Sequence, residues 1–462
     1  MRVLLIDPAR GFYAEKSPGK IIKQTPNIGL AYLAAILKKE GIDVDVLDIS
    51  ITKRSLIDVL KSFEPDIVGI SSMTFNIKDA YICAKTAKKF NPNILTVIGG
   101  PHPSALPYET LKECKYLDSV VKGEGEKSFK EIIYNLAKGE EISKVYINNP
   151  IEDLDTIPFP DWSIFNIEKN YSKAYNFRWG DMRNIYPIIT ARGCPFNCIF
   201  CYSHYLGPGV RFRSPENVIE EIMRNIDDYG ASYFYFADDN FSLNQERLLK
   251  ICDLLIENGI NEEITWKCQS KISTVNGKTL KRMREASCEL VFYGIETGNE
   301  AIQKKIGKNL TREMIRKAVD DARIAGLYVR ASFIIGLPYE TKESCMETIN
   351  FAKSLNLTSS VFHILDVYPG TELERLLVSG EGGMKKISEE VSRVSAMVEV
   401  NDLDGESIVT LAKMGNDIVY GDTMLDNVHQ YITELKYYRE TYPNVHSQYL
   451  INVKPCIHRW SA

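Results

Sequence analysis

Long apolar runs are absent from this sequence of 462 residues, and none approaches the length that a membrane-spanning helix needs. Residues 1–7 contain an apolar run, but it is too short for the core of a signal peptide and a charge soon follows. Positive charge is not in excess, because the formal net charge is −5, which argues against a non-specific nucleic-acid binder. We therefore expect a globular cytoplasmic protein, and its length predicts two or three domains.

Cysteine is scattered thinly except in one short stretch. The sequence has ten cysteines, and in a chain without an export signal they indicate a reducing compartment. Seven lie far apart in sequence, and buried free thiols are the simplest interpretation of these: Cys83, Cys114, Cys252, Cys268, Cys288, Cys345 and Cys456. The other three are Cys194, Cys198 and Cys201.

These three cysteines are separated by three and then two residues, directly after an apolar run. Thiolates are soft ligands suited to iron–sulfur clusters, zinc or copper. A four-iron cluster normally takes four protein ligands, so three would leave one iron open to another molecule. A zinc site with His204 as the fourth ligand is the alternative, and a disulfide is not expected without export.

The spacing of the cysteines, with Phe200 immediately before the third, resembles the signature of the radical S-adenosylmethionine (SAM) superfamily. In that superfamily the open iron is chelated by the amino and carboxylate groups of SAM. The resemblance implies a [4Fe-4S] cluster on Cys194, Cys198 and Cys201, with Phe200 beside the bound SAM.

Residues 1–140 alternate apolar strands with amphipathic helices. This pattern predicts a Rossmann-like, doubly wound parallel sheet, because continuous apolar strands must be covered on both faces. The predicted strands are 3–7, 44–48, 67–71, 94–99 and 119–121, and the predicted helices are 29–39, 55–63, 78–90 and 126–137.

Small and polar residues follow three of these strands, at the edge where such sheets bind ligands. Glycine there lets a cofactor approach the backbone closely, although sharp turns explain glycines equally well. The candidate cofactor residues are Ser71, Thr74, Gly99, Gly100, Pro101, Gly123 and Glu124.

These turns, with the run from Pro26 to Ala34, resemble the cobalamin-binding domain that precedes the barrel in one radical-SAM subfamily. The Asp-x-His-x-x-Gly motif that supplies a lower axial histidine in other cobalamin proteins is absent. The resemblance therefore implies cobalamin held base-off without a protein histidine, and His102 is interpreted as a turn residue. A vestigial domain that binds no cobalamin is the alternative.

Six strand–helix units follow in residues 186–380 and predict a partial (β/α)6 barrel of the TIM type. The cysteines follow its first strand, on the carboxyl-end loops where barrels carry their chemistry. The predicted strands are 185–191, 233–237, 263–267, 290–295, 329–335 and 360–367, and the predicted helices include 215–229, 245–258, 280–285, 312–325 and 342–355.

Later strand ends carry groups that the resemblance assigns to SAM. Asp238 and Asp239 stand where the superfamily has a Gly-Gly-Glu-like motif for the SAM amino group, and capping of the next helix is a rival role for Asn240. Ser270 and Lys271 offer a partner for the SAM carboxylate, Glu296 for the ribose hydroxyls, and Gly336 a close backbone approach for adenine.

Two further segments complete the predicted organisation. Residues 141–185 are interpreted as a linker whose proline-set part packs across the domain interface through Phe159 and Trp162, and whose residues 168–185 form a lid. Residues 381–462 predict a helical cap over the barrel mouth, with helices at 406–416 and 422–440.

The family resemblance implies a cobalamin-dependent radical SAM enzyme that works anaerobically with an external one-electron reductant. SAM cleavage at the cluster would release methionine and a 5′-deoxyadenosyl radical, which takes hydrogen from an unactivated carbon of the substrate. Methylcobalamin would then deliver a methyl group to that carbon, and a second SAM would restore the cofactor. The protein supplies positioning and excludes water.

Three alternatives remain open at this stage. The same architecture hosts radical cyclisation and rearrangement without methyl transfer. A methylthiotransferase acting on transfer RNA would need three cysteines in the first domain, where only Cys83 and Cys114 occur. A non-catalytic cobalamin or zinc sensor would not need Asp238, Lys271 and Glu296. We expect a small-molecule, lipid or peptide substrate and no nucleic-acid partner.

Overall fold

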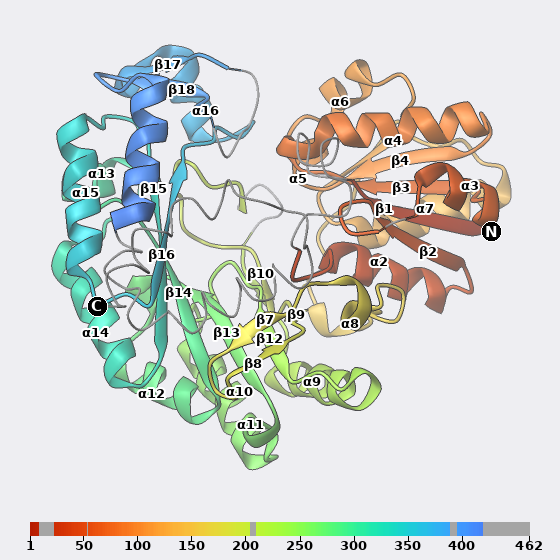
Figure 1. The fold of residues 1–462 in the computed structure, drawn as a ribbon. Helices are drawn as coiled ribbons and strands as arrows, with labels where there is room; N and C mark the ends of the chain where they lie inside the picture. The colour runs from red at the N-terminus through yellow and green to blue at the C-terminus, as the bar shows by residue number, and fades with distance from the viewer. Residues whose placement is uncertain (9–22, 53, 204–208, 389–394, 419–462) are drawn as a thin grey trace, which may run out of the picture.

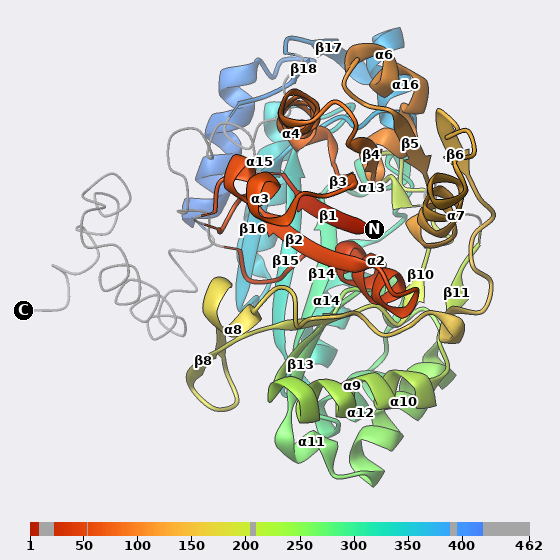
Figure 2. The same ribbon diagram turned by 90° about the vertical axis from the view of Figure 1, so that its right-hand side faces the viewer.

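The computed structural model describes residues 1–8, 23–52, 54–203, 209–388 and 395–418. Two six-stranded parallel sheets organise this part of the chain (Figure 1). Figures 1 and 2 show the first sheet and its helices on the inner side of the second sheet, opposite the helices α12 (Gly277–Glu285) and α14 (Arg312–Ile324). The predicted fold class is therefore confirmed.

The first sheet has the strand order β2-β1-β3-β4-β5-β6, and all of its neighbouring strands run parallel. Its middle strands are almost wholly apolar and buried, as a sheet covered on both faces requires. The strands are β1 (Arg2–Asp7), β2 (Asp43–Asp48), β3 (Ile67–Ser71), β4 (Leu95–Gly99), β5 (Ser119–Lys122) and β6 (Val145–Ile147).

Helices cover the two faces of this sheet with different partners. The helices α3 (Leu56–Phe63) and α4 (Ile77–Phe90) pack on one face and close a core of their own. The helices α2 (Ile28–Lys39) and α7 (Gly125–Lys138) pack on the other face, in a core that continues through the join into the second sheet. The first domain is therefore fixed to the barrel by shared apolar packing.

Three elements of the first domain escaped prediction. The strand β6 lies within the predicted linker, where a short Val-Tyr-Ile run pairs with β5. The helices α5 (Pro101–Ala105) and α6 (Pro107–Glu113) follow β4 where we expected only a turn. Both helices begin at a proline, which is well suited to the first helical position and is easily taken for a turn signal alone.

The join packs across the interface as predicted. Trp162 is fully buried in the shared core, and Asp161 pairs with Lys38 of α2 at 2.6 Å. Phe159 lies under the Arg213 guanidinium of the barrel, 5.4 Å from ring centroid to guanidinium carbon. The linker therefore contacts both domains.

The predicted lid over residues 168–185 is wrong. This segment forms the hairpin β7 (Ala174–Asn176) and β8 (Asp181–Arg183). Phe177 stacks on Tyr328, and its backbone N–H donates to Glu289 at 3.0 Å. Both partners lie at the starts of barrel strands, so the aromatic residues close the end of the barrel opposite the cysteines.

The second sheet has the order β16-β15-β14-β13-β12-β9 and is parallel throughout, which confirms the predicted six-stranded partial barrel. The strands are β9 (Tyr186–Ile188), β12 (Tyr233–Phe236), β13 (Thr265–Ser270), β14 (Cys288–Glu296), β15 (Tyr328–Ile335) and β16 (Ser359–Ile364). Its helices besides α12 and α14 include α9 (Pro215–Tyr229), α10 (Gln245–Glu257), α13 (Glu300–Lys305), α15 (Lys342–Ser354) and α16 (Glu372–Ser379).

The tail is only partly the helical cap that we predicted. It contains an antiparallel pair, β17 (Met384–Lys386) and β18 (Val398–Val400), and then a helix over residues 405–418. Ile408 and Leu411 of that helix are buried in the shared core. The helix predicted at 422–440 lies outside the described residues.

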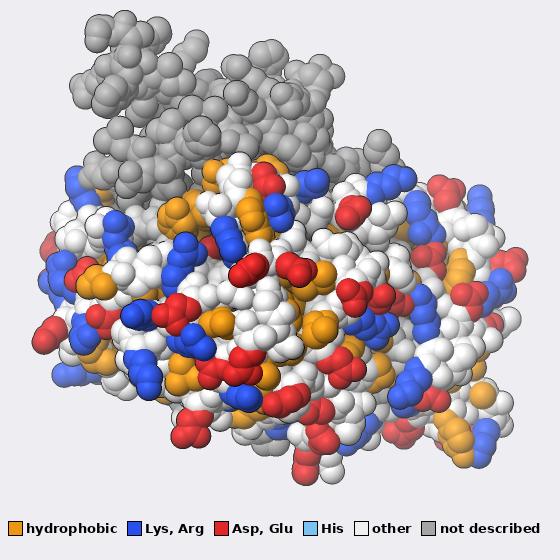
Figure 3. Space-filling view, turned by 90° about the horizontal axis from the view of Figure 1, so that it is seen from below, with side chains coloured by type: hydrophobic (Ala, Val, Ile, Leu, Met, Phe, Trp, Pro, Cys, Tyr) orange, Lys and Arg blue, Asp and Glu red, His pale blue; other side chains and the backbone are white. Residues whose placement is uncertain are grey.

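No helix in the described part of the chain is both long and apolar enough to cross a membrane. The surface that Figure 3 shows from below carries acidic and basic side chains intermixed, without a field of one sign. That face does not have the basic patch typical of nucleic-acid binding.

Candidate active site

The three cysteines lie on a loop that leaves the carboxyl end of the first barrel strand. The short strands β10 (Ala191–Arg192) and β11 (Arg211–Phe212) pair and hold the base of this cysteine loop, residues 193–203 and beyond. Ile199 anchors its centre, because its N–H donates to Ile306 at 3.2 Å and its carbonyl accepts from Leu373 at 2.9 Å. The loop is thus fixed to the ends of α13 and α16.

A glycine at the end of α13 allows this close approach. Gly307 has a φ of +76°, and a Cβ atom there would lie 2.7 Å from the carbonyl oxygen of Asn197. Both the left-handed backbone and the contact favour glycine. Phe200, predicted to lie beside SAM, packs in part against the apolar cluster that contains Ile306 and Leu373.

The cysteine thiols are free, partly buried and close to two lysines. Burial raises the pKa values of Cys194 and Cys198, while the positive charges of Lys271 and, for Cys198, Lys308 lower them. Cations beside thiols favour the thiolate form that binds metal. The two lysines would therefore help to stabilise Cys194 and Cys198 as the thiolates that a metal cluster needs.

The alternative of a single zinc ion depends on His204, which lies outside the described residues. No three His, Cys, Asp or Glu side chains among the described residues converge as a metal-binding group. Zinc would need its ligands to meet at one ion, whereas a four-iron cluster takes each thiolate on a separate iron. The three thiols and the nearby Lys271 and Lys308 therefore suit the ligand set of the predicted cluster.

Lys271 and Glu296 meet the cysteine loop from neighbouring strand ends. The Lys271 ammonium lies 3.4 Å from the ring centroid of Phe196, within the loop itself. Glu296 is buried, and its Oε1 accepts from the Lys308 ammonium at 2.7 Å. Its other oxygen accepts from the Ser332 hydroxyl at 3.3 Å. Both predicted residues therefore lie near the cysteines.

Glu296 also has an unusual backbone. Its φ is +68°, a left-handed conformation that non-glycine residues seldom adopt. The register of β14 against β15 shifts between Gly294 and Glu296, which turns the carboxylate toward Lys308. Strained backbone of this kind is a feature of functional sites.

The structure separates the roles of the two aspartates after β12. Asp238 is buried, and its carboxylate accepts from the backbone N–H groups of Thr190 and Ala191 at 2.6 and 3.0 Å. It therefore ties the strand ends of β9 and β12 together. Asp239 is exposed at the same edge, which makes it the better candidate for the SAM amino group.

Asn240 does not cap the next helix, contrary to the alternative considered above. The N-cap of α10 is Asn244. The Asn240 side-chain oxygen instead accepts from the Lys271 N–H at 3.0 Å and from the Ser242 hydroxyl at 3.1 Å. Asn240 thus fixes the backbone of Lys271.

Ser270 and Gly336 are less open than predicted. The Ser270 hydroxyl is buried 3.8 Å from the Cys268 sulfur, on the strand face that packs on helices. Gly336 has a φ of +97°, and its N–H donates to the buried Glu340 carboxylate at 2.8 Å. A Cβ at this glycine would point toward Ile408, so packing accounts for the glycine as well as a ligand would.

The predicted cobalamin residues gather along the carboxyl edge of the first sheet. Each is partly exposed: Ser71, Thr74, Gly99, Gly100, Pro101, Gly123 and Glu124. Gly100 has a φ of +103°, and a Cβ there would lie 2.6 Å from the Ser72 carbonyl oxygen. The edge is therefore a close-packed backbone platform.

His102 is directed into this platform. It is buried on α5, its Nδ1 lies 3.2 Å from the Thr74 hydroxyl, and burial lowers its pKa. These contacts agree with its interpretation as a structural residue of the turn.

Ion pairs join the carboxyl edges of the two sheets. Glu124, which follows β5, binds Arg211 at 2.6 Å and Arg192 at 3.1 Å. Arg192 also binds Glu126 at 2.6 Å, and it stands two residues before Cys194. The edge predicted to hold cobalamin therefore faces the mouth of the barrel. The Glu124 carboxylate is committed to this interface, and the two arginines lower its pKa.

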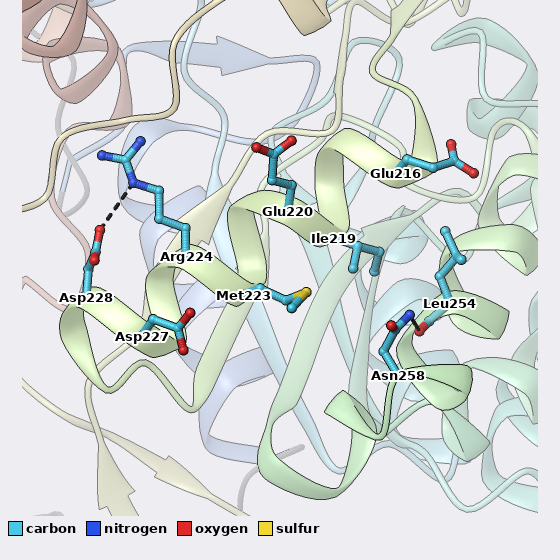
Figure 4. A pocket seen from close by; sticks show the side chains of 9 residues that line it. All are labelled: Glu216, Ile219, Glu220, Met223, Arg224, Asp227, Asp228, Leu254 and Asn258. Carbon is cyan, nitrogen blue, oxygen red and sulfur yellow. Dashed lines mark hydrogen bonds and ion pairs between the residues drawn. The ribbon is translucent and has the colours of Figure 1, made fainter.

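A shallow pocket elsewhere has no such chemistry. It lies along the outer surfaces of α9 and α10, where Arg224 pairs with Asp228 at 3.2 Å (Figure 4). None of the predicted site residues lines it.

Comparison with known proteins identifies the two halves of the chain. The family model described as "B12 binding domain" matches residues 19–133, and that described as "Radical SAM superfamily" matches residues 188–352. An uncharacterised methyltransferase of Pyrococcus horikoshii, PH0819, is 37% identical over 81% of this chain and 82% of its own length. The chain belongs to the cobalamin-binding radical SAM family.

Other members of this family are similar over most of the chain. Cytidylyl-2-hydroxyethylphosphonate methyltransferase of Streptomyces wedmorensis is 27% identical over 90% of this chain and 89% of its own. An anaerobic magnesium-protoporphyrin IX monomethyl ester cyclase of Cereibacter sphaeroides is 28% identical over 76% of this chain and 60% of its own.

Among solved structures, the radical SAM methyltransferase TsrM of Kitasatospora setae with cobalamin and a [4Fe-4S] cluster has a TM-score of 0.63. It shares 18% identity over 80% of this chain and 76% of its own. This likeness shows the cobalamin-binding radical SAM fold. The two family models confirm the predicted cofactors: cobalamin, a [4Fe-4S] cluster and SAM.

Sequence analysis did not identify several charged residues around the candidate site. Lys308, Arg192, Arg211 and Glu126 act only through long-range contacts, and no local motif marked them. The same holds for Lys23, whose ammonium binds Asp7 and Asp48 at the ends of β1 and β2. The only local signal in the sequence is the position of Arg192, two residues before Cys194.

Proposed function

We propose that this enzyme methylates an unactivated carbon of its substrate. The observation that carries the proposal is the Arg192 bridge to Glu124 and Glu126, which joins the two sheets at their carboxyl edges. Ligands of such sheets and barrels bind at these edges, so the two cofactor sites face each other. The bound cofactors supply radical generation from SAM and a transferable methyl group.

Different residues position the cluster and SAM and exclude water. Cys194, Cys198 and Cys201 hold the cluster, and Lys271 offsets its negative charge. The paired Glu296 and Lys308 orient SAM by charge-assisted hydrogen bonds, which are short and directional. The aromatic floor formed by Phe177 and Tyr328 excludes water from the opposite end.

Ser71, Thr74, Gly99, Gly100, Pro101 and Gly123 would hold cobalamin at the carboxyl edge of the first sheet, without a protein histidine as ligand. The burial of His102 and its contact with Thr74 support this proposal. Bound there, the cofactor would supply a transferable methyl group. In cob(II)alamin-loaded protein, electron paramagnetic resonance should show no nitrogen splitting from a histidine.

Radical cyclisation is the second candidate, because a cyclase is among the similar proteins. Transfer-RNA methylthiolation receives no support, since Cys83 and Cys114 are both buried in the apolar core of the first domain. Buried, protonated thiols of this kind do not hold a second cluster.

The enzyme is proposed to act in a reducing, anaerobic cytoplasm with an external one-electron donor. The nine cysteines in the described residues are all free, which agrees with that compartment. Its substrate is a small molecule, lipid or peptide, and it needs no nucleic acid.

The test is anaerobic reconstitution with iron, sulfide and cobalamin, followed by assay with SAM and dithionite as the one-electron reductant. We expect 5′-deoxyadenosine from the wild type and none from a variant with all three cysteines changed to Ala. S-adenosylhomocysteine should accumulate only when cobalamin is present. A triple variant that retains its iron and still forms 5′-deoxyadenosine would refute the assignment.

A further inference from the structure

The inner face of the second sheet carries two cations that the proposed function leaves without a role. Lys267 of β13 and Arg330 of β15 alternate with residues such as Cys268, Val291 and Ala331, which are buried against the helices. Successive side chains of a strand point to opposite faces. Lys267 and Arg330 therefore face the inside of the barrel.

Register places these cations in adjacent layers. Lys267 pairs with Tyr235 on one side and Leu290 on the other, and Arg330 pairs with Phe292 one layer nearer the cysteine loop. The Lys267 ammonium lies 5.2 Å from the Tyr233 ring centroid and 5.8 Å from that of Tyr235. Tyr235 lies beside Lys267 in its own layer and Tyr233 lies in the layer below, so aromatic rings flank the ammonium.

Arg330 has no partner among the described residues. It is exposed, and no hydrogen bond or ion pair joins its guanidinium to that part of the chain. Arg330 also acts on Lys267: burial and then the charge of Arg330 lower the pKa of Lys267 to about 8, against the opposing effect of Glu289. Two cations held near each other are unfavourable unless an anion joins them.

Glu289 acts on Lys267 rather than on Arg330: its charge raises the pKa of Lys267, while burial raises the pKa of Glu289 itself. Its Oε2 accepts from the backbone N–H groups of Phe177 and Arg178 at 3.0 and 3.3 Å. Arginine presents a planar fork of donors that matches a carboxylate or phosphate. Glu289 therefore balances part of the charge of Lys267, whereas the donors of Arg330 stay open to an anion within the described part of the chain.

We propose that Arg330, with Lys267 beneath it, binds an anionic carboxylate or phosphate group of the substrate. This rests on the proposed function, because it assigns the substrate of the same barrel. Arg330 stands two residues before Ser332, whose hydroxyl donates to Glu296 at 3.3 Å. Along β15 the backbone of Arg330 therefore lies about 7 Å before that of Ser332, on the side away from the cysteine loop.

The probes are inorganic phosphate and acetate, added separately to the holoenzyme saturated with SAM at constant ionic strength. A ligand that binds only the folded state raises Tm with its concentration. We expect at least one anion to raise Tm, and Arg330→Gln to weaken its apparent affinity by about tenfold or more. The anion that shifts Tm identifies the group as a phosphate or a carboxylate.

Arg316→Gln is the matched control, since Arg316 lies on the outside of α14 and binds the Ser354 hydroxyl at 2.9 Å. Arg316→Gln should show the same anion-induced rise in Tm as the wild type. Because salts affect the stability of all variants alike, comparing it with Arg330→Gln separates specific binding from the general effect of salts. Equal shifts in the wild type and in Arg330→Gln, or none with either anion, would overturn the proposal.

This outcome is separable from that of the proposed function. An Arg330-dependent shift in an enzyme that transfers no methyl group would retain the anion site and refute methylation. Methyl transfer without an Arg330-dependent shift in Tm would support methylation and refute the anion site. Once a substrate is known, Arg330→Gln should raise KM more than it lowers kcat, and Arg330→Lys should restore part of the affinity.

Discussion

Arg192 of the barrel lies with its guanidinium 2.6 Å from Glu126 of the first domain and 3.1 Å from Glu124. Its side chain is only 16% exposed, so this bridge is partly withdrawn from water. Because Arg192 precedes Cys194 by two residues and both glutamates follow β5, the bridge connects the cysteine loop directly to the carboxyl edge of the first sheet. It fixes the spacing between the two cofactor sites.

Arg192→Gln should therefore uncouple the two halves of the reaction. We expect a loss of about 2 kcal/mol in the free energy of unfolding, because hydrogen bonds between charged groups are lost. We also expect more 5′-deoxyadenosine formed per methylated product. Arg375→Gln is the control, since Arg375 pairs with Glu372 on an exposed surface. Equal product ratios in both variants would argue against a coupling role.

The Glu296–Lys308 pair gives a test of the SAM site. Glu296→Ala and Lys308→Met should each weaken SAM binding about tenfold or more, since each removes charge-assisted hydrogen bonds worth about 1.5–3 kcal/mol. The double variant should lose less than the sum of the single losses, because the two groups act together. Calorimetric titration with SAM measures all three, and unchanged affinity in both single variants would place SAM elsewhere.

Gly100 and Gly99 should respond differently to Ala. A Cβ at Gly100 would collide with the Ser72 backbone, whereas one at Gly99 would meet Val121 at 3.6 Å, an ordinary contact. We expect Gly100→Ala to lose about 1–3 kcal/mol of stability through backbone strain, and Gly99→Ala to fold normally. Thermal unfolding of the cobalamin-free protein decides this, and equal Tm values would contradict the geometry. A bulky residue at Gly100 is thus unsuited to testing cobalamin binding.

The buried Glu340 makes stability depend on pH. Burial raises its pKa from 4.5 to about 7, although the Gly336 and Leu337 N–H groups act in the opposite direction. The folded state then binds more protons than the unfolded state between these pH values, so this group reduces stability as pH rises from 4.5 to 7. The shift corresponds to about 3 kcal/mol.

Glu340→Gln should remove this dependence while keeping an oxygen for both N–H groups. Denaturant unfolding at several pH values measures the difference between the wild type and the variant. That difference should grow in favour of the variant from pH 4.5 to 7 and stay constant above. A constant difference over the whole range would show that Glu340 is ionised in the folded enzyme.

The local pattern of the sequence predicted most of the fold. Apolar runs and amphipathic spacing located all six barrel strands, and α9 begins and ends at Pro215 and Tyr229 as predicted. The lid was wrong because aromatic residues such as Phe177 indicate burial without indicating the surface that buries them. Their contacts with Glu289 and Tyr328 arise from residues more than a hundred positions away.

In the candidate site, too, residues in local motifs could be predicted from the sequence, whereas residues positioned by distant contacts could not. The cysteines stand in a local motif, and Lys271 and Glu296 follow strands, so their positions could be predicted. Lys308 reaches Glu296 from the loop after α13, and Arg192 reaches Glu126 across the domain interface. Likewise, no local signal distinguishes the buried Asp238 from the exposed Asp239. Side-chain partners of this kind are fixed by tertiary packing.

The central claim is that SAM gives both a radical and a methyl group to one substrate. The most direct measurement incubates the reconstituted holoenzyme with anaerobic host extract and SAM carrying a trideuteriomethyl group, followed by mass spectrometry. Our account predicts a product that carries the trideuteriomethyl group, formed together with 5′-deoxyadenosine and S-adenosylhomocysteine and absent from the triple cysteine variant. Turnover that yields 5′-deoxyadenosine and a changed substrate without any label would contradict it and establish a radical cyclisation or rearrangement.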